Sequence, residues 1–286
     1  MAKIITRVWN HIQNEWFSQI KPMLFAALAH LRWMARRTAK PHHLPAPLVI
    51  SLTSHPPRFR SLKRTLECLL TQTLQVDRII LWIAHDDRVF LSDTILGFVH
   101  KGVDIRFCQD LRSYNKIIPT LDEMPDAIIV TADDDIYYWP TWLEELVNAH
   151  RNDPQFVLCH RAHNIRLNKE GNPIAYEDWD FEIQEEDNSN LTFPTGIAGV
   201  LYPPGIFHED VLRRDIFLEL SPLNDDIWLH WMVRLNGGIS RKIGPRRALI
   251  YWPGSQTKAL HLNNLNAGGN DRQILTIIER YGFPNI

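Results

Sequence analysis

Three consecutive aspartates, Asp133, Asp134 and Asp135, are the residues of this sequence best suited to chemistry. They directly follow an apolar and β-branched run, 128–131, which is short enough for a strand buried on both faces. Adjacent carboxylates repel one another unless a cation, a helix N-terminus or water accommodates them, and hard divalent cations prefer oxygen ligands. Two interpretations follow: a metal site at a strand end, or an acidic turn that caps the helix predicted to start near Pro140.

A second acidic pair, Asp225 and Asp226, follows Asn224 at the start of a helix predicted to run through Leu235. A carboxylate at this position can accept a proton from a hydroxyl nucleophile, and we favour Asp226 over Asp225 in that role. The same residues would also make a good helix cap without any chemistry. Both interpretations stay open from the sequence alone.

Further candidates are scattered along the chain. Lys116, Arg58 and Arg60 are candidates to neutralise phosphate, although lone basic residues are more often solvated surface groups. His261 lies between two leucines, where a structural role competes with that of a metal ligand. Gly199 precedes a short apolar run, which indicates either close approach of a ligand to the backbone or a tightly packed strand.

The pattern of the first half predicts the elements that would position these side chains. Strands are expected at 48–52, 78–84, 103–108 and 128–131, with helices after 62, over 92–99 and over 114–124. This alternation specifies a parallel sheet covered by helices, with ligands beyond the carboxyl ends of the strands. Each predicted strand end carries polar residues: Thr53 and Ser54, Asp86 and Asp87, Gln109 and Asp110, and the aspartate triplet.

The second half is less regular. We expect a helix over 141–149, strands at 156–159 and 249–252, and a final helix over 271–281. Residues 164–193 are polar and acidic and are expected to form a long excursion over the site.

Four motifs in order resemble nucleotide-sugar glycosyltransferases of the GT-A fold, especially a bacterial, family-2-like branch. The aspartate triplet resembles the Asp-x-Asp motif, and Tyr114-Asn115-Lys116-Ile117-Ile118-Pro119 resembles the segment that precedes it. Asn224-Asp225-Asp226 resembles the acceptor-side acidic pair, although its first acid is Asp where Glu is usual. His261 lies where many members have a late histidine. The resemblance covers about residues 47–270.

The resemblance implies a Rossmann-like, mostly parallel central sheet flanked by helices, and transfer of a sugar from a nucleotide-sugar, of which a UDP-sugar is the favoured donor, to a hydroxyl of a surface glycan or glycolipid. It implies a Mn²⁺ or Mg²⁺ ion bound by Asp135, Asp133 and His261, with inversion by a carboxylate base. The donor would contact Thr53, Ser54, Arg58, Asp86, Asp87, Lys116, Asp133, Asp134 and Gly199.

The first forty residues differ from the rest in charge. They hold seven Lys or Arg and the single acid Glu15, so the remainder of a chain with net charge −2 is distinctly acidic. Apolar residues from Ile5 to Ile20 recur at helical spacing up to Pro22, and a second apolar stretch at 23–31 is too interrupted to span a bilayer. This arm is expected either to lie on the inner-membrane surface or to pack on protein. Nucleic-acid binding is not expected, because the body is acidic.

We therefore predict an arm over 1–44 and a catalytic domain over 45–286, divided into a nucleotide-binding half (45–135) and an acceptor-binding half (136–286). Three cysteines without metal-ligand spacing indicate reduced thiols and a cytoplasmic location, peripheral on the membrane if the arm binds there. Two alternatives remain: a nucleotidyltransferase, which would need a glycine-rich basic loop that residues 53–57 do not supply, and a non-catalytic membrane-associated scaffold with the same fold.

Overall fold

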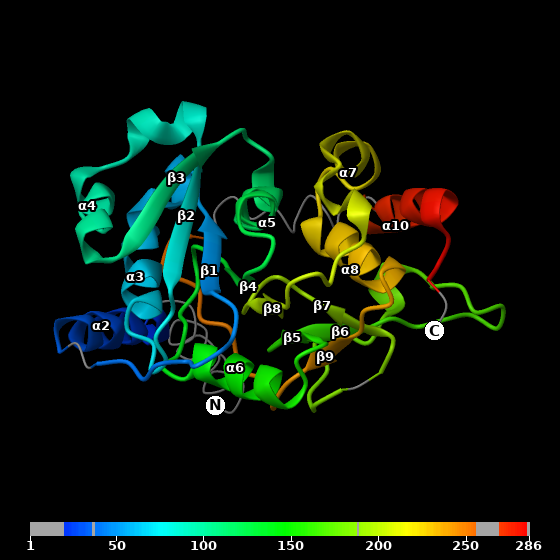
Figure 1. The fold of residues 1–286 in the computed structure, drawn as a ribbon, viewed down its shortest axis with the longest axis horizontal. Coiled ribbons are helices and arrows are strands. Elements are labelled where there is room, and N and C mark those ends of the chain that lie inside the picture. The colour runs from blue at the N-terminus through cyan, green and yellow to red at the C-terminus, as the bar shows by residue number, and fades with distance from the viewer. Residues whose placement is uncertain (1–19, 36–37, 188, 256–268, 285–286) are drawn as a thin grey trace, which may run out of the picture.

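A seven-stranded, mostly parallel sheet forms the centre of the molecule, in the order β3-β2-β1-β4-β8-β5-β9 (Figure 1). The computed structural model describes residues 20–35, 38–187, 189–255 and 269–284. The strands are β1 (Leu48–Thr53), β2 (Arg78–Ala84), β3 (Val103–Cys108), β4 (Ile128–Ala132), β5 (Val157–Cys159), β8 (Val200–Tyr202) and β9 (Ser240–Lys242). The predicted α/β class with a mostly parallel sheet is confirmed.

The first four strands are all parallel, and β1 pairs with both β2 and β4. Their carboxyl ends therefore lie at one edge of the sheet, which brings the residues after β1, β2 and β4 together. Strand β8 runs antiparallel to both β4 and β5 and joins the two halves of the sheet. A separate two-stranded sheet pairs β6 (Ala162–Asn164) with β7 (Thr192–Pro194).

Helices cover both faces of the sheet: α2 (Lys21–Met34), α3 (Phe59–Leu69), α4 (Asp93–Leu96), α5 (Ile118–Glu123), α6 (Trp142–Asn152), α7 (Arg214–Leu220), α8 (Asp225–Leu235) and α10 (Gly269–Tyr281). Short 3₁₀ segments connect them: η2 (Pro56–Arg58), η3 (His85–Phe90), η4 (Val99–Lys101), η5 (Arg112–Lys116), η6 (Tyr176–Asp178) and η7 (Glu209–Leu212). In Figure 1, α2, α3 and α4 lie around the first half, whereas α7, α8 and α10 gather at the other end of the molecule.

The core has two layers, one on each face of the sheet, because side chains alternate between the faces along each strand. In β1, Leu48, Ile50 and Leu52 belong to the apolar cluster that includes α3 and α6, whereas Val49 faces the opposite layer with Trp82 of β2. Because successive residues of a strand point to opposite faces, a strand covered on both sides must be apolar throughout.

Several predicted elements differ from the observed ones. Residues 114–124 are not one helix: η5 ends at Lys116 and α5 begins at Ile118, because Pro119 suits the first turn of a helix and not its interior. The helix predicted over 92–99 is only the short α4 (Asp93–Leu96), followed by η4. The amphipathic helix predicted from Ile5 to Ile20 lies almost wholly outside the described residues, and Pro22, where it was expected to end, lies in the first turn of α2.

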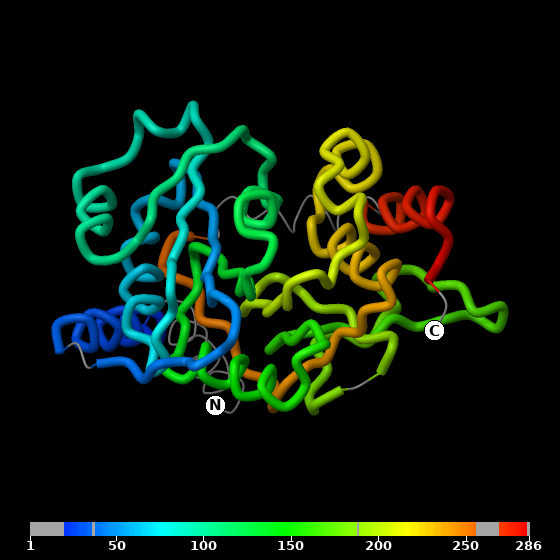
Figure 2. The backbone as a smooth tube through the Cα atoms, in the orientation of Figure 1, coloured from blue at the N-terminus to red at the C-terminus, as the bar shows by residue number. Residues whose placement is uncertain are grey.

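The strand predicted at 249–252 is also wrong. This segment pairs at a single bridge, between Tyr251 and Ile136, and Trp252 is instead buried in the core with its indole N–H donating to Thr65 Oγ1 at 2.7 Å. Figure 2 shows this segment, in orange, crossing back from β9 to the first half of the molecule. The excursion 164–193 contains η6 and the start of β7, and none of its described residues lines the cavity described below.

Candidate functional site

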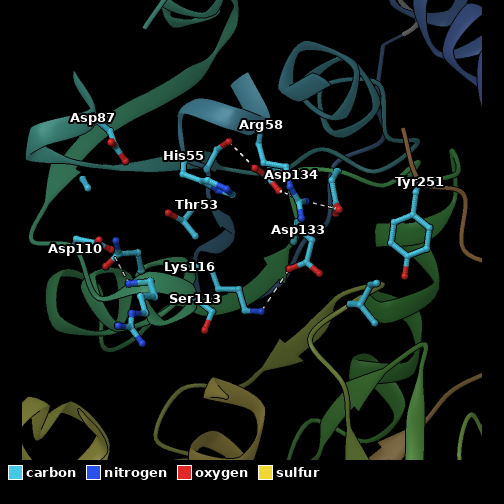
Figure 3. Close-up of a pocket in the computed structure, with 17 residues that line it drawn as sticks. Thr53, His55, Arg58, Asp87, Asp110, Ser113, Lys116, Asp133, Asp134 and Tyr251 are labelled. Carbon is cyan, nitrogen blue, oxygen red and sulfur yellow. Dashed lines mark hydrogen bonds and ion pairs between the residues drawn. The ribbon is translucent and has the colours of Figure 1, made fainter. Parts of the chain in front are cut away.

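A cavity of about 420 Å³ lies at the carboxyl ends of β1, β2 and β4 (Figure 3). In Figure 3, Asp87 and Asp110 lie at one end of the cavity and Tyr251 at the other, with Lys116 and Asp133 between them. The cavity is lined by Thr53, Ser54, His55, Arg58, Ala84, Asp87, Asp110, Arg112, Ser113, Asn115, Lys116, Ala132, Asp133, Asp134, Asp135, Ile197 and Tyr251. Its size suits a ligand of several linked groups.

Asp134 is buried beneath the loop that follows β1. Its carboxylate accepts a hydrogen bond from Ser54 Oγ at 2.5 Å and pairs with Arg58 Nη1 at 3.1 Å. Its backbone carbonyl accepts from Thr65 Oγ1 at 2.9 Å, which ties the triplet to α3. Burial raises the pKa of this carboxyl, while Arg58 and Ser54 oppose that shift. Asp134 therefore holds the loops after β1 and β4 together.

Asp133 and Asp135 face the cavity on either side of Asp134. Arg58 also pairs with Asp135, whose pKa is raised to about 7 by burial and by the negative charge of Asp133. The Asp133 backbone N–H donates to the Tyr138 hydroxyl at 2.7 Å, which fixes the backbone of the turn. Both carboxylates thus line one cavity and repel each other there.

The triplet does not cap a helix. Helix α6 begins at Trp142, its N-cap residue is Thr141, and its first turn contains Glu144 and Glu145. Hydrogen bonds and ion pairs join these aspartate side chains to Ser54, Arg58 and Lys116, and the N-cap residue of α6 makes no side-chain capping hydrogen bond. The capping interpretation of this acidic run is therefore wrong.

Lys116 connects the aspartate triplet to the acidic pair on α8. Its ammonium lies 3.4 Å from Asp133 Oδ1 and 3.1 Å from Asp225 Oδ2. Burial lowers the pKa of this lysine, but the negative charges of Asp133, Asp225 and Asp226 outweigh burial and raise it well above its usual range. Lys116 is therefore a buried cation held between two acidic groups, one after β4 and one at the start of α8.

Asp226 lies in the first turn of α8, beside the glycine segment that leads to β8. Its Oδ1 accepts from the Gly196 N–H at 2.9 Å, and its own N–H donates to the Asn224 side chain at 3.0 Å. Asn224 is thus the residue that caps α8, as predicted. Burial and neighbouring Asp225 raise the pKa of Asp226 to about 7, which is the range a general base needs near neutral pH.

The charge of the site fits a divalent cation. The carboxylates in or beside the cavity are Asp87, Asp110, Asp133, Asp134, Asp135, Asp225 and Asp226, and the basic side chains are Arg58, Arg112 and Lys116. This excess of acids disfavours an anionic ligand on its own. Among the described residues, no three His, Cys, Asp or Glu side chains converge as a complete metal shell. Mg²⁺ commonly takes one or two carboxylates and completes its shell with substrate phosphates, and Asp133 and Asp135 fit that arrangement.

The structure places most predicted donor-binding and metal-binding residues around the cavity: Thr53, Ser54, Arg58, Asp87, Lys116, Asp133, Asp134 and Asp135 all line it. Asp86 and Arg60 are exposed and do not line it. Gly199 does not line it either, since a Cβ at that position would overlap the indole of Trp142. His261 lies outside the described residues.

Several residues in or beside the cavity were not predicted as site residues. Asp110 follows β3 just as Asp133 follows β4, so its position at a strand end was an available signal. Gly196 approaches closely enough that a Cβ there would lie 2.6 Å from Lys116 Nζ and 2.7 Å from Asp226 Oδ1. His55 and Tyr251 carry no distinguishing sequence pattern, because the loop after β1 and the bridge to Ile136 bring them to the cavity.

Neither a scan against protein-family models nor a search of curated proteins found a match to this chain. The function is therefore inferred from the geometry and charge of the cavity.

Proposed function

We propose that this protein is a metal-dependent glycosyltransferase of the GT-A type, which transfers a sugar from a nucleotide-sugar to a hydroxyl acceptor. One observation carries the proposal: Lys116 links the carboxylates that end β4 to the acidic pair that begins α8, next to a cavity at the carboxyl ends of three parallel strands. Such a site has a metal-binding side for a diphosphate and a separate carboxylate for an attacking hydroxyl.

The arrangement of the sheet supports the GT-A assignment. The four parallel strands in the order β3-β2-β1-β4 form a nucleotide-binding half, and the acidic motif follows the last of them, as the resemblance implies. Antiparallel β8 and the following α8 bring the acceptor-side acids next to the donor side.

The donor diphosphate would lie between the triplet and the basic side chains of the cavity. Asp133 and Asp135 would hold the Mn²⁺ or Mg²⁺ ion, which when bound offsets the charge of the leaving diphosphate. Asp134, already paired with Ser54 and Arg58, holds the loop in place, whereas Lys116 faces the same space with an ammonium group. Asp87 and Asp110, at the far end of the cavity, are in position to accept hydrogen bonds from ribose or base.

Asp226 is the better candidate for the base. Asp225 is buried and its carboxylate is paired with Lys116, whereas Asp226 is somewhat less buried and its pKa is raised to about 7. In the proposed step the acceptor oxygen forms a bond to the anomeric carbon as its proton passes to Asp226. The bond from that carbon to the diphosphate breaks, and the nucleoside diphosphate leaves with its electron pair. A single displacement of this kind inverts the anomeric centre.

We assign a UDP-sugar as the donor class and a surface glycan or glycolipid hydroxyl as the acceptor. The free thiols Cys68 and Cys159 are both buried, which supports a reducing, cytoplasmic compartment. The role would be in surface polysaccharide synthesis on the cytoplasmic face of the membrane.

A screen of nucleotide-sugars tests the proposal. Purified protein is incubated with UDP-, GDP- and dTDP-sugars in the presence of Mn²⁺, and released nucleotide and nucleotide binding are both measured. We expect one donor class to be bound and slowly hydrolysed, and the Asp135→Ala variant to lose both signals. If no nucleotide bound in the presence of Mn²⁺, the glycosyltransferase assignment would be overturned in favour of a non-catalytic scaffold.

A further inference from the structure

Helix α2 packs on the body of the protein through one of its faces. Ala29 is fully buried, and Phe25 makes an edge contact with Tyr137 at 4.7 Å between ring centroids. Arg32 donates to the Thr71 carbonyl at 3.0 Å, which anchors the helix near the end of α3. This face of α2 is therefore part of the fold, and the helix is held in a fixed orientation.

The opposite face of α2 is apolar and exposed. We call it the outer stripe: Ile20, Leu24, Leu28, Leu31 and Met34, which recur at intervals of three and four residues along one side of the helix. Leu24 and Leu28 are each 50% exposed, and Leu31 is 60% exposed. The helix contains no acidic residue. A row of large apolar side chains in a helix already anchored by its other face indicates an interaction surface.

Basic residues lie on α2, beside it, or next to it in the sequence. Lys21 lies in the first turn of α2, and Lys101 lies beside the helix with its ammonium 5.5 Å from the ring of Trp33. In the sequence, Arg36, Arg37 and Lys40 follow the helix closely, and Lys3 and Arg7 precede it among apolar residues at helical spacing. An apolar stripe with a basic border complements a surface that is apolar inside and anionic outside.

We propose that the outer stripe docks on an anionic phospholipid surface, with α2 lying in the plane of the membrane interface. A second copy of the chain is disfavoured as the occupant of the stripe, because it would bring the same basic border against itself. Residues 1–19 are disfavoured as the occupant as well, because they carry two basic residues and only one acid. Anionic headgroups neutralise the border while the acyl boundary covers the leucines. No helix within the described ranges is long and apolar enough to cross a bilayer, so docking is at the interface.

Figure 1 places α2 at the outer edge of the first half, beside α3 and far from α7, α8 and α10. A bilayer at this edge would leave the second half of the molecule free. The proposal does not depend on the proposed function, because it concerns lipid binding in the absence of nucleotide.

Vesicle co-sedimentation with the full chain tests the proposal. We expect the wild-type protein to bind vesicles of phosphatidylcholine and phosphatidylglycerol, to bind vesicles of phosphatidylcholine alone more weakly, and to be released by added salt. The Leu24→Glu/Leu28→Glu variant is expected to lose roughly tenfold or more in partitioning, because two apolar side chains no longer enter the interface.

The matched control is Leu218→Glu/Leu275→Glu, which changes two exposed leucines on α7 and α10 in the same way. It is expected to bind as the wild type does, and circular dichroism of both variants checks that they are folded. Equal binding by the two variants, or no binding by the wild type, would overturn the proposal. A wild-type dimer that is lost in Leu24→Glu/Leu28→Glu, without vesicle binding, would also overturn it and assign the stripe to a second copy.

Discussion

The ammonium of Lys116 lies 3.1 Å from a carboxylate oxygen of Asp225, and more than nine-tenths of each side chain is buried. The same ammonium lies 3.4 Å from Asp133. One lysine thus joins the end of β4 to the beginning of α8, the two elements assigned to the donor and acceptor sides.

Replacing Lys116 by Met should destabilise the fold as well as abolish activity. Removing the cation leaves the buried carboxylate of Asp225 without its ion-pair partner, and breaking a buried pair from one side costs about 3 kcal/mol or more. Urea unfolding followed by fluorescence measures this loss.

The double variant Lys116→Met/Asp225→Asn separates stability from activity. Because it removes the uncompensated charge, the unfolding free energy should recover most of the loss, while turnover stays low since the diphosphate still lacks the ammonium. A double variant as unstable as Lys116→Met alone would show that the pair is not the source of the effect.

Gly196→Ala should reduce activity more than stability. Its Cβ would lie 2.6 Å from Lys116 Nζ and 2.7 Å from Asp226 Oδ1, so both groups must move, and the ammonium is at the end of a flexible chain that can do so. We expect kcat/KM to fall about tenfold, equivalent to about 1.4 kcal/mol, with a smaller change in the free energy of unfolding.

Gly199→Ala is the comparison for that variant. Gly199 has a φ of 91°, and a Cβ there would overlap the buried indole of Trp142. The expected result is a loss of stability of roughly 3 kcal/mol from strain and overpacking. Gly196 is assigned to the site and Gly199 to the core. If Gly196→Ala were the less stable of the two variants, this assignment would be contradicted.

The contribution of Asp135 to the stability of the metal-free protein should fall as pH rises. The pKa of Asp135 is about 7 in the folded protein, whereas an aspartate in the unfolded chain has an ordinary pKa of 3.8. Between these two pH values the unfolded chain loses a proton that the folded chain keeps. Asp135→Asn removes this contribution, and its advantage over wild type should grow from about pH 4 to about pH 7, by about 4 kcal/mol at most. Chemical denaturation in a chelator at several pH values measures the gap, and parallel curves would contradict the assigned pKa.

Turnover should rise with pH through the titration of Asp226. Its pKa of about 7 means that the carboxyl is protonated and inactive as a base in mild acid, and becomes ionised and able to accept the acceptor proton above neutrality. The kcat profile measured with Mn²⁺ should therefore show an ascending limb near neutral pH.

Asp226→Asn should lose at least about a hundredfold in kcat while still binding donor. Retained turnover in that variant would remove Asp226 from the mechanism.

The sequence alone was enough to predict the parallel half of the sheet and the acidic strand end. Ile128 to Thr131 are apolar or β-branched and stop at Asp133, so period and length both identify a buried strand whose end is charged. The cap at Asn224 was equally predictable, because its preference for that position is local.

The remaining features depend on contacts between distant segments. Whether Gly196 or Gly199 approaches the cavity depends on where Trp142 packs, and Tyr251 reaches it through one bridge to Ile136. The helical periodicity of α2 indicates an apolar face, but only its packing on α3 shows which leucines stay exposed. Tertiary packing, which no local pattern encodes, decides each of these cases.

Calorimetric titration of nucleoside diphosphates, beginning with UDP, tests the central claim most directly. The claim is that Asp133 and Asp135 bind a divalent cation together with the donor diphosphate. The titration is performed with wild type and Asp135→Ala, each in Mn²⁺ and in a chelator. We predict binding by the wild type in Mn²⁺ and in none of the other three conditions. Equal binding in the chelator, or unchanged binding by Asp135→Ala, would contradict the claim.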